Sequence, residues 1–216
     1  MRYNFCVEVK LFFIESNNDF SATEKKKVTN IAEKVFSESV ELLGITHDVN
    51  ITFYRWGKKN GGFTQAKDWI KVTIPKGYID YLDLEAMLYH ELHHTVRGYA
   101  GYMEHGKHYL LNSLFSEGLA TAFELDKEQK GRKSTHGRYT MKLVEEWLPK
   151  TKKEFYSTAH YDYAGWFHGK GRPKQLGYKL GKYLYDEIKR HHPELTHKDL
   201  VKKEAKELLQ LSKVKI

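Results

Sequence analysis

The sequence predicts an α+β protein in which a small mixed sheet with one helix precedes a mostly helical half. Short runs rich in Phe, Val, Ile and Trp occur before residue 75, and apolar residues recur at helical spacing in much of the chain after it. No repeat, linker or low-complexity tract divides the 216 residues. We therefore expect one domain over 1–216, with an α/β half at about 1–100 and a helical half at about 101–216, and a single core.

The first half is expected to build the sheet. Three short runs rich in β-branched and aromatic residues indicate strands: 3–14, 50–56 and 69–74. Ser21-Ala22-Thr23-Glu24 has the pattern of a capping box, and the apolar stripe after it continues until Gly44. This pattern predicts one long helix that packs on the sheet.

The third strand bears on function. Asn60-Gly61-Gly62 has the composition of a turn, and the run 69–74 then alternates buried and wetter positions. If this strand lies at an edge of the sheet, its backbone can pair with an extended peptide. An ordinary strand without a substrate role is the alternative, and the sequence leaves both open.

The helix that follows carries the clearest chemical motif, His90-Glu91-Leu92-His93-His94. Asp83 can cap it, and apolar residues recur every fourth position from Leu84. Residues four apart lie on one face of a helix, so the imidazoles of His90 and His94 can hold one cation together, as in zinc sites. Glu91, about 100° further around the helix, can reach a water on the same metal and is the candidate general base.

A third ligand is expected from the next helix, at residues 110–123. Glu117 is its one carboxylate among apolar residues, and a buried carboxylate requires a partner such as a metal ion. Gly118 would let this helix approach the histidine helix closely. His105 and His108 are the alternatives to Glu117, whereas His93 points about 100° away from His94 and is expected to pack or to support the site.

The rest of the chain is expected to be helical. The predicted features are a helix near 139–148, a long aromatic connection at 154–173, a helix at 175–191 and a last helix capped by Thr196. The connection is either a lid over a site or a loop that its own aromatic residues hold in place. Gly177 and Gly181 would allow another helix to approach the predicted helix at 175–191 closely.

These motifs resemble the gluzincin metallopeptidases, in which a later helix follows H-E-x-x-H with E-G-x-A, here Glu117-Gly118-Leu119-Ala120. Within that group, residues 65–190 resemble the YjaZ-like family of predicted bacterial Zn-dependent proteases. That family continues its histidine motif to an Arg, here Arg97, and has a late G-Y-x-x-G segment, here Gly177–Gly181. The resemblance implies a zincin-like fold, one Zn²⁺ per chain and hydrolysis of a peptide or protein substrate.

The resemblance also implies a Tyr or His that stabilises the oxyanion of the tetrahedral intermediate. Tyr178 is the first candidate, and Tyr163 and His168 are the alternatives. Two other functions use the same ligands: a non-catalytic zinc-binding interaction or sensor protein, and a zinc hydrolase of a small amide or acyl substrate. The position of Glu91 favours catalysis, because a purely structural zinc site does not need a base.

Composition bears on the binding partners of the protein and on its location in the cell. The formal charge of +8 arises from 36 basic and 28 acidic residues, with basic and acidic residues interleaved in the expected helices. We expect the charged residues to form solvated helix faces. We do not expect nucleic-acid binding, because neither a Walker loop nor a cysteine-based finger occurs. The sequence contains no run of about 18 apolar residues, so we expect no membrane span. A single cysteine, Cys6, and the lack of a visible signal peptide lead us to expect a cytoplasmic protein, whose oligomeric state stays open.

Overall fold

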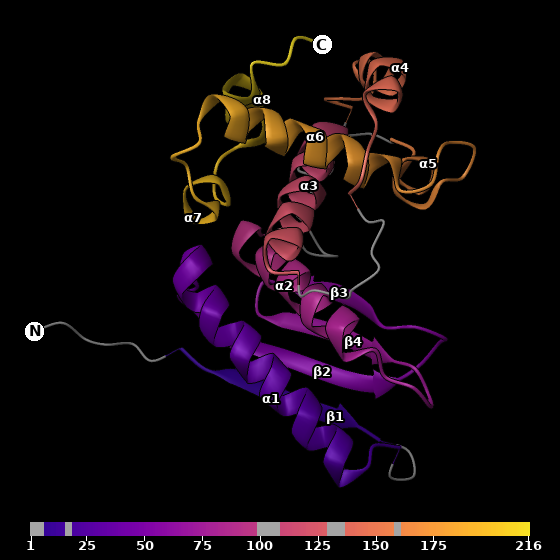
Figure 1. Cartoon of the computed structure of the whole chain (residues 1–216), viewed down its shortest axis with the longest axis vertical. Helices are drawn as coiled ribbons and strands as arrows, with labels where there is room; N and C mark the ends of the chain where they lie inside the picture. The colour runs from indigo at the N-terminus through magenta and orange to yellow at the C-terminus, as the bar shows by residue number, and fades with distance from the viewer. Residues whose placement is uncertain (1–6, 16–18, 99–108, 129–136, 158–160) are drawn as a thin grey trace, which may run out of the picture. The chain divides into compact units, whose positions relative to one another are not determined.

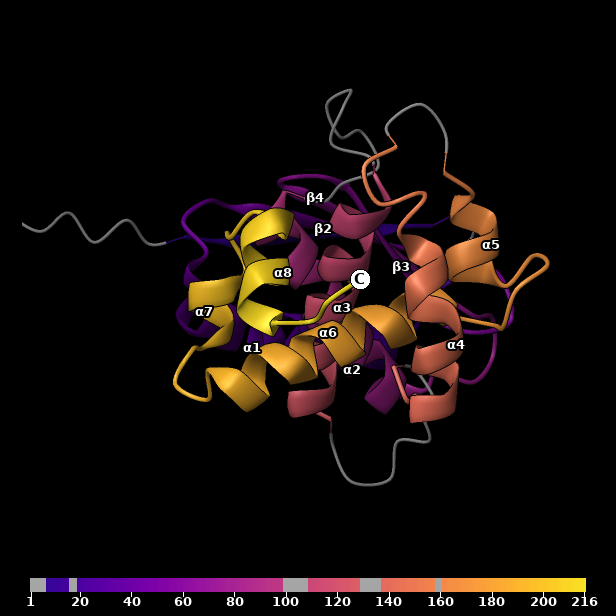
Figure 2. The ribbon, with the colours of Figure 1, turned by 90° about the horizontal axis from the view of Figure 1, so that it is seen from above.

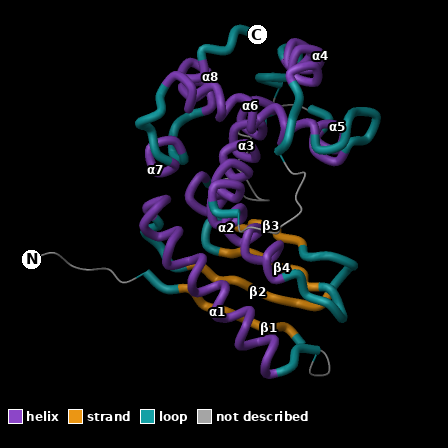
Figure 3. Tube along the Cα trace, in the orientation of Figure 1, coloured by secondary structure: helices purple, strands orange, loops and turns teal. Residues whose placement is uncertain are grey.

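The computed structural model describes residues 7–15, 19–98, 109–128, 137–157 and 161–216. The chain forms two compact units. The first, called the sheet unit here, comprises Met1–Tyr102 and Glu124–Arg132, and the second, the helical unit, comprises Met103–Phe123 and Lys133–Ile216. The described residues confirm a mixed α+β protein with a small four-stranded sheet and a mostly helical remainder (Figures 1 and 3).

The sheet has the order β1-β2-β4-β3. Its strands are β1 (Val9–Ile14), β2 (Val49–Arg55), β3 (Gly61–Ala66) and β4 (Trp69–Ile74). β1, β2 and β4 are parallel, while β3 runs antiparallel to β4, so the sheet is mixed as expected. The register pairs Phe53 with Phe13 on one side and with Val72 on the other, which places apolar side chains of neighbouring strands in rows on the buried face.

The structure corrects the prediction for the segment 60–74. β4 lies inside the sheet, between β2 and β3, so the run 69–74 is not an edge strand. The edge next to β4 is formed by β3, which begins at Gly61 where the sequence indicated a turn. Two successive glycines have low strand propensity, and this hid the strand. The structure explains the glycines by space, because a Cβ at Gly61 would lie 2.7 Å from Oγ1 of Thr73.

Helix α1 (Ala22–Ser39) packs on this sheet and on the next helix (Figure 1). The predicted capping box is present: Ser21 accepts from the backbone N–H of Glu24, and the Glu24 side chain accepts from that of Ser21. A short π-helical segment, η1 (Val40–Gly44), continues α1. Gly44 closes it in the left-handed region with φ 69°, where glycine carries no steric penalty.

Helix α2 (Tyr81–Arg97) carries the histidine motif. It starts earlier than the sequence indicated: Asp80, not Asp83, is the N-cap, and its side chain accepts from the backbone N–H of Asp83. Gly98, with φ 72°, ends it in the left-handed conformation. From Leu84 to Thr95 nearly every residue of α2 is buried, so its polar side chains lie in the interior.

The remaining helices belong to the helical unit, apart from the last turn of α3. They are α3 (Leu110–Asp126), α4 (Met141–Thr151), α5 (Tyr163–His168), α6 (Leu176–His191), α7 (His197–Leu200) and α8 (Ala205–Ser212). α6 packs against α4, α5 and α8 (Figure 2). The predicted last helix is divided in two: Thr196 caps α7, and a short break precedes α8. The predicted connection 154–173 contains a short helix, α5.

Two glycines set the crossing of α3 and α6. A Cβ at Gly118 would overlap the backbone of Gly181, and a Cβ at Gly181 would overlap the carbonyl of Leu114. The prediction that Gly181 allows close helix approach is confirmed. The prediction that Gly118 serves the approach to the histidine helix is wrong, because its Cα faces α6 instead. None of the described helices is both long and apolar enough to cross a membrane.

Candidate metal centre

Helix α2 presents His90 and His94 together. The two rings lie 4.7 Å apart between centroids at an interplanar angle of 82°, and the residues are 7% and 4% exposed. Side chains four residues apart on a helix project to the same side, which is why the sequence spacing gives this geometry. The pair therefore forms a buried donor set whose nitrogen atoms can share one ligand.

Glu124, in the last turn of α3, fixes the orientation of His90. Its Oε2 lies 3.0 Å from Nδ1 of His90, and Glu124 is 2% exposed. An ionised carboxylate only accepts hydrogen bonds, so Nδ1 carries the proton and donates it, and Nε2 keeps its lone pair for a metal. Glu124 was not among the residues predicted from the sequence. The signal was its spacing, because Glu124 follows Glu117 by seven residues, close to two helical turns, and so projects from the same side of α3.

Glu117 is buried, with 4% exposure, on α3. The hydroxyl of Tyr163 donates to its Oε1 over 3.5 Å. In the described part of the chain, His90, His94 and Glu117 form a group that could hold a metal ion, because each offers one ligand atom and these atoms lie within 4.8 Å of one another. These are the three residues that the sequence predicted as ligands, and their role stays a prediction.

Glu91, the predicted base, is buried beside the edge strand β3. Oγ1 of Thr64 lies 2.7 Å from Oε2 of Glu91 and 3.0 Å from its backbone oxygen. A Cβ at Gly62 would lie 2.6 Å from Cγ of Glu91. Strand β3 thus provides both the space and a hydrogen-bond donor for this carboxylate. Neither Gly62 nor Thr64 was identified from the sequence, because the strand itself was not recognised.

The three candidates for oxyanion stabilisation lie in one aromatic group of the helical unit. The ring of Tyr163 stacks on Phe167 at 4.7 Å, and Tyr178 meets Phe167 edge-on at 5.3 Å. His168 meets Tyr163 edge-on at 5.5 Å. Among these three, the hydrogen bond to Glu117 described above belongs to Tyr163. Gly177 makes the packing possible, since a Cβ there would overlap the ring of Phe167.

The sequence also indicated several residues outside the proposed ligand set. His93 is fully buried, with its ring centroid 6.4 Å from that of His94. Arg97 lies in the last turn of α2 and is half-buried. His105, His108 and Cys6 lie outside the described residues.

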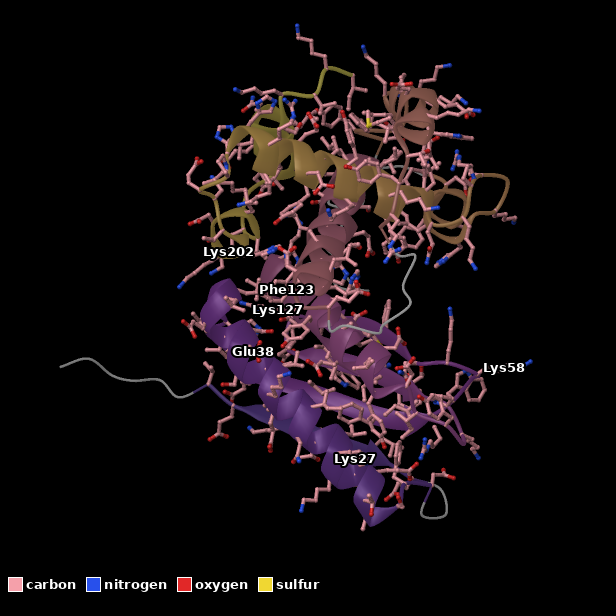
Figure 4. The ribbon with its side chains drawn as sticks, viewed as in Figure 1. Lys27, Glu38, Lys58, Phe123, Lys127 and Lys202 are labelled. Carbon is pink, nitrogen blue, oxygen red and sulfur yellow. The ribbon has the colours of Figure 1, made fainter. Side chains whose placement is uncertain are left out.

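A polar network joins α1 to α2 through Tyr89, which directly precedes the motif, and through Glu85. The hydroxyl of Tyr89 donates to Glu38 over 2.8 Å. Nζ of Lys127 lies 3.4 Å from the same carboxylate, and Figure 4 labels Glu38 and Lys127. Burial, together with the hydrogen bond to Glu38, raises the pKa of Tyr89 well above its usual value, so this tyrosine stays a neutral donor. Lys34 and Glu85 add an ion pair at 2.8 Å. The network anchors the helix that carries the histidines.

Comparison with known proteins gives one family. Residues 20–210 match the family model described as "Predicted Zn-dependent protease (DUF2268)". No curated protein and no solved structure matches the chain. The match covers most of the chain and includes both α2 and α3.

Proposed function

Because the chain belongs to the DUF2268 family of predicted Zn-dependent proteases, we propose that it is a zinc peptidase of the gluzincin type with a zincin-like fold. One Zn²⁺ is held by His90, His94 and Glu117. The observation that carries the proposal is the buried group of two imidazoles and one carboxylate whose ligand atoms lie within 4.8 Å of one another.

The donor set suits zinc. Two neutral imidazoles and one carboxylate are the ligands of many catalytic zinc sites, which use three protein ligands. The hydrogen bond from His90 to Glu124 supports the choice, because histidines that bind metals usually donate their other ring N–H to a carboxylate or carbonyl. Other first-row divalent ions accept the same ligands. The proposal of zinc therefore rests on the ligand chemistry together with the description of the family.

The mechanism assigns separate tasks to the residues. When bound, zinc lowers the pKa of a coordinated water to about 7 and polarises the substrate carbonyl. Glu91 accepts the proton of the attacking water and then transfers it to the leaving amine, so that one carboxylate serves both steps. Tyr163 is the first candidate to donate to the developing oxyanion, because its hydroxyl already reaches Glu117; Tyr178 is the second.

The substrate is an extended peptide. Within the described sheet β3 has a neighbour on one side only, β4, and its backbone offers hydrogen bonds along the other side. A peptide that pairs with this edge presents its carbonyl groups at regular intervals. The strand proposed to pair with the peptide is therefore Gly61–Ala66, and not the run 69–74 that the sequence suggested.

The test combines metal analysis with hydrolysis of a broad fluorogenic peptide library. We expect one zinc per parent chain, loss of zinc in Glu117→Ala, and full zinc content without cleavage in Glu91→Gln. Glu146→Gln, on the exposed side of α4, is the matched control and should behave as the parent.

Three outcomes would contradict parts of the proposal. Zinc retained by Glu117→Ala removes Glu117 from the ligand set, and cleavage retained by Glu91→Gln removes the base. Zinc bound by a parent that cleaves no peptide favours a non-catalytic zinc protein or a hydrolase of small amides, and a screen of amide and acyl substrates separates these two.

A further inference from the structure

We infer that Thr64 is a positioning residue for Glu91: its hydroxyl holds one carboxylate oxygen, so that the other oxygen is directed to the reacting water. The inference rests on the proposed peptidase function and names the part of the sheet that sets the geometry of the base. Thr64 itself does not touch the reacting atoms.

The contact is short and lies in the interior. Oγ1 of Thr64 is 2.7 Å from Oε2 of Glu91, and the two residues are 3% and 7% exposed. The backbone oxygen of Glu91 lies 3.0 Å from the same hydroxyl, and the single proton is assigned to the carboxylate because that acceptor is nearer and charged. Hydrogen bonds to an ionised acceptor are about twice as strong as neutral ones, and water competes little at a buried site. The bond therefore selects one orientation of a side chain that otherwise has several rotatable bonds.

Gly62 completes the arrangement on the same face of β3. Residues two apart in a strand face the same side, so positions 62 and 64 both face α2. A Cβ at Gly62 would lie 2.7 Å from Oε1 of Glu91 and 2.6 Å from its Cγ. The strand therefore leaves room at one position and provides a donor at the next position on that face. Because Oε2 is engaged by Thr64, we assign Oε1 to the proton of the water.

The consequence concerns the alignment of base and substrate. Under the proposed function, a peptide pairs with the outer edge of β3, while Thr64 ties the base to the inner face of that strand. One short strand thus sets both the register of the peptide and the position of Glu91. A displacement of about 1 Å in a reacting group can cost a factor of about 100 in rate. The hydroxyl at position 64 is therefore expected to affect the chemical step more than substrate binding.

The kinetic test uses Thr64→Val, which has nearly the same shape without the hydroxyl, and Thr64→Ser, which restores the hydroxyl. We expect Thr64→Val to lower kcat by about 10- to 100-fold with KM and zinc content unchanged, and Thr64→Ser to recover most of the loss. Thr73→Val is the control, because it removes a hydroxyl from the neighbouring strand that bonds to Gly61 rather than to Glu91. A parental kcat in Thr64→Val, or equal losses in the Val and Ser variants, would overturn the inference.

A second measurement needs neither metal nor activity. Urea unfolding of metal-free Thr64→Val, Glu91→Ala and the double variant forms a double-mutant cycle. We expect the shifts in unfolding midpoint to be non-additive, because the two residues share one contact; additive shifts would overturn the inference. If the parent cleaves no peptide, the proposed function fails, whereas the cycle still decides whether the two side chains are coupled.

Discussion

At the scale of single residues, the hydrogen bond between His90 and Glu124 is the most specific support for a metal ligand. The carboxylate fixes the tautomer of the imidazole, so that Nε2 keeps its lone pair for a metal. We expect Glu124→Ala to weaken zinc affinity by about 10- to 100-fold. Glu124→Gln should have a smaller effect, because its amide oxygen still accepts from Nδ1. Zinc affinity is measured by competition with a chromophoric chelator, with Glu146→Gln as the control; parental affinity in Glu124→Ala would exclude this role.

The second prediction at this scale separates Tyr163 from Tyr178. The hydroxyl of Tyr163 reaches Glu117, whereas Tyr178 packs edge-on against Phe167. We expect Tyr163→Phe to lower kcat by about 100-fold or more, the usual cost of losing one oxyanion donor, with little change in KM. Tyr178→Phe, its matched control, should keep most of the activity. The reverse result would assign the role to Tyr178, the residue that the sequence favoured.

Helical spacing is what made part of the site predictable. His90, Glu91 and His94 follow from a four-residue period, and Glu117 from a single carboxylate in an apolar helix. Thr64 and Glu124 were missed for different reasons. Thr64 reaches Glu91 through a pairing of strand and helix that no local pattern encodes, whereas Glu124 had a readable spacing from Glu117 that carried no recognised motif.

At the scale of elements, the N-terminus of α1 provides a pH-dependent contribution to stability. The backbone N–H of Ser21 and the guanidinium of Arg55 lower the pKa of Glu24 below its usual 4.5. Because this pKa is lower in the folded state, the ionised carboxylate stabilises the fold above pH 4.5, and the contribution is lost as the pH falls through the folded-state pKa.

We therefore expect Glu24→Ala to lower the free energy of unfolding by about 1 kcal/mol at pH 7, the usual cost of losing a cap. Its difference from the parent should shrink as the pH is lowered below about 4. Urea unfolding at several pH values measures both effects. Glu33→Ala, exposed on the same helix, is the control; a difference from the parent that persists unchanged in acid would contradict the assignment.

Most elements were predictable, and the exceptions have physical causes. The strands at 50–56 and 69–74 and the helix at 175–191 follow from apolar periodicity and agree with β2, β4 and α6. β3 was missed because the two glycines at its start have low strand propensity. They occur there because neighbouring side chains leave no space for a Cβ. The helix predicted near 139–148 extends further than expected, because α4 continues through Pro149 to Thr151.

At the scale of the whole molecule, metal binding should be linked to stability. A ligand that binds only the folded protein stabilises it by about 2.7 kcal/mol at a concentration 100 times its Kd. We expect Zn²⁺ to raise the thermal unfolding midpoint of the parent, and a chelator to reverse the change. His94→Ala should remove this response, while His191→Ala, at the end of α6, should keep it. An unchanged response in His94→Ala would place the zinc elsewhere.

The charge of the molecule also follows a predicted pattern. Several lysines of the helical unit pair with an acidic residue one turn away: Lys150 with Glu146, Lys182 with Asp186, and Lys203 with Glu207. Such pairs are typical of solvated helix faces, as the interleaved sequence indicated. The sequence places the boundary between an α/β half and a helical half near residue 100. It could not predict that Glu124–Arg132 belong to the sheet unit, because that assignment depends on contacts between distant segments.

The composition of β3 has a consequence for the protein in concentrated solution. Sheets usually protect their edges from self-association with charged residues or proline. The strand Gly-Gly-Phe-Thr-Gln-Ala contains neither, and Phe63 is 51% exposed on it. An edge that accepts a substrate strand cannot carry such protection, so the same backbone groups are open to a strand of another copy. Susceptibility to aggregation is thus a direct cost of the way in which this peptidase is proposed to hold its substrate.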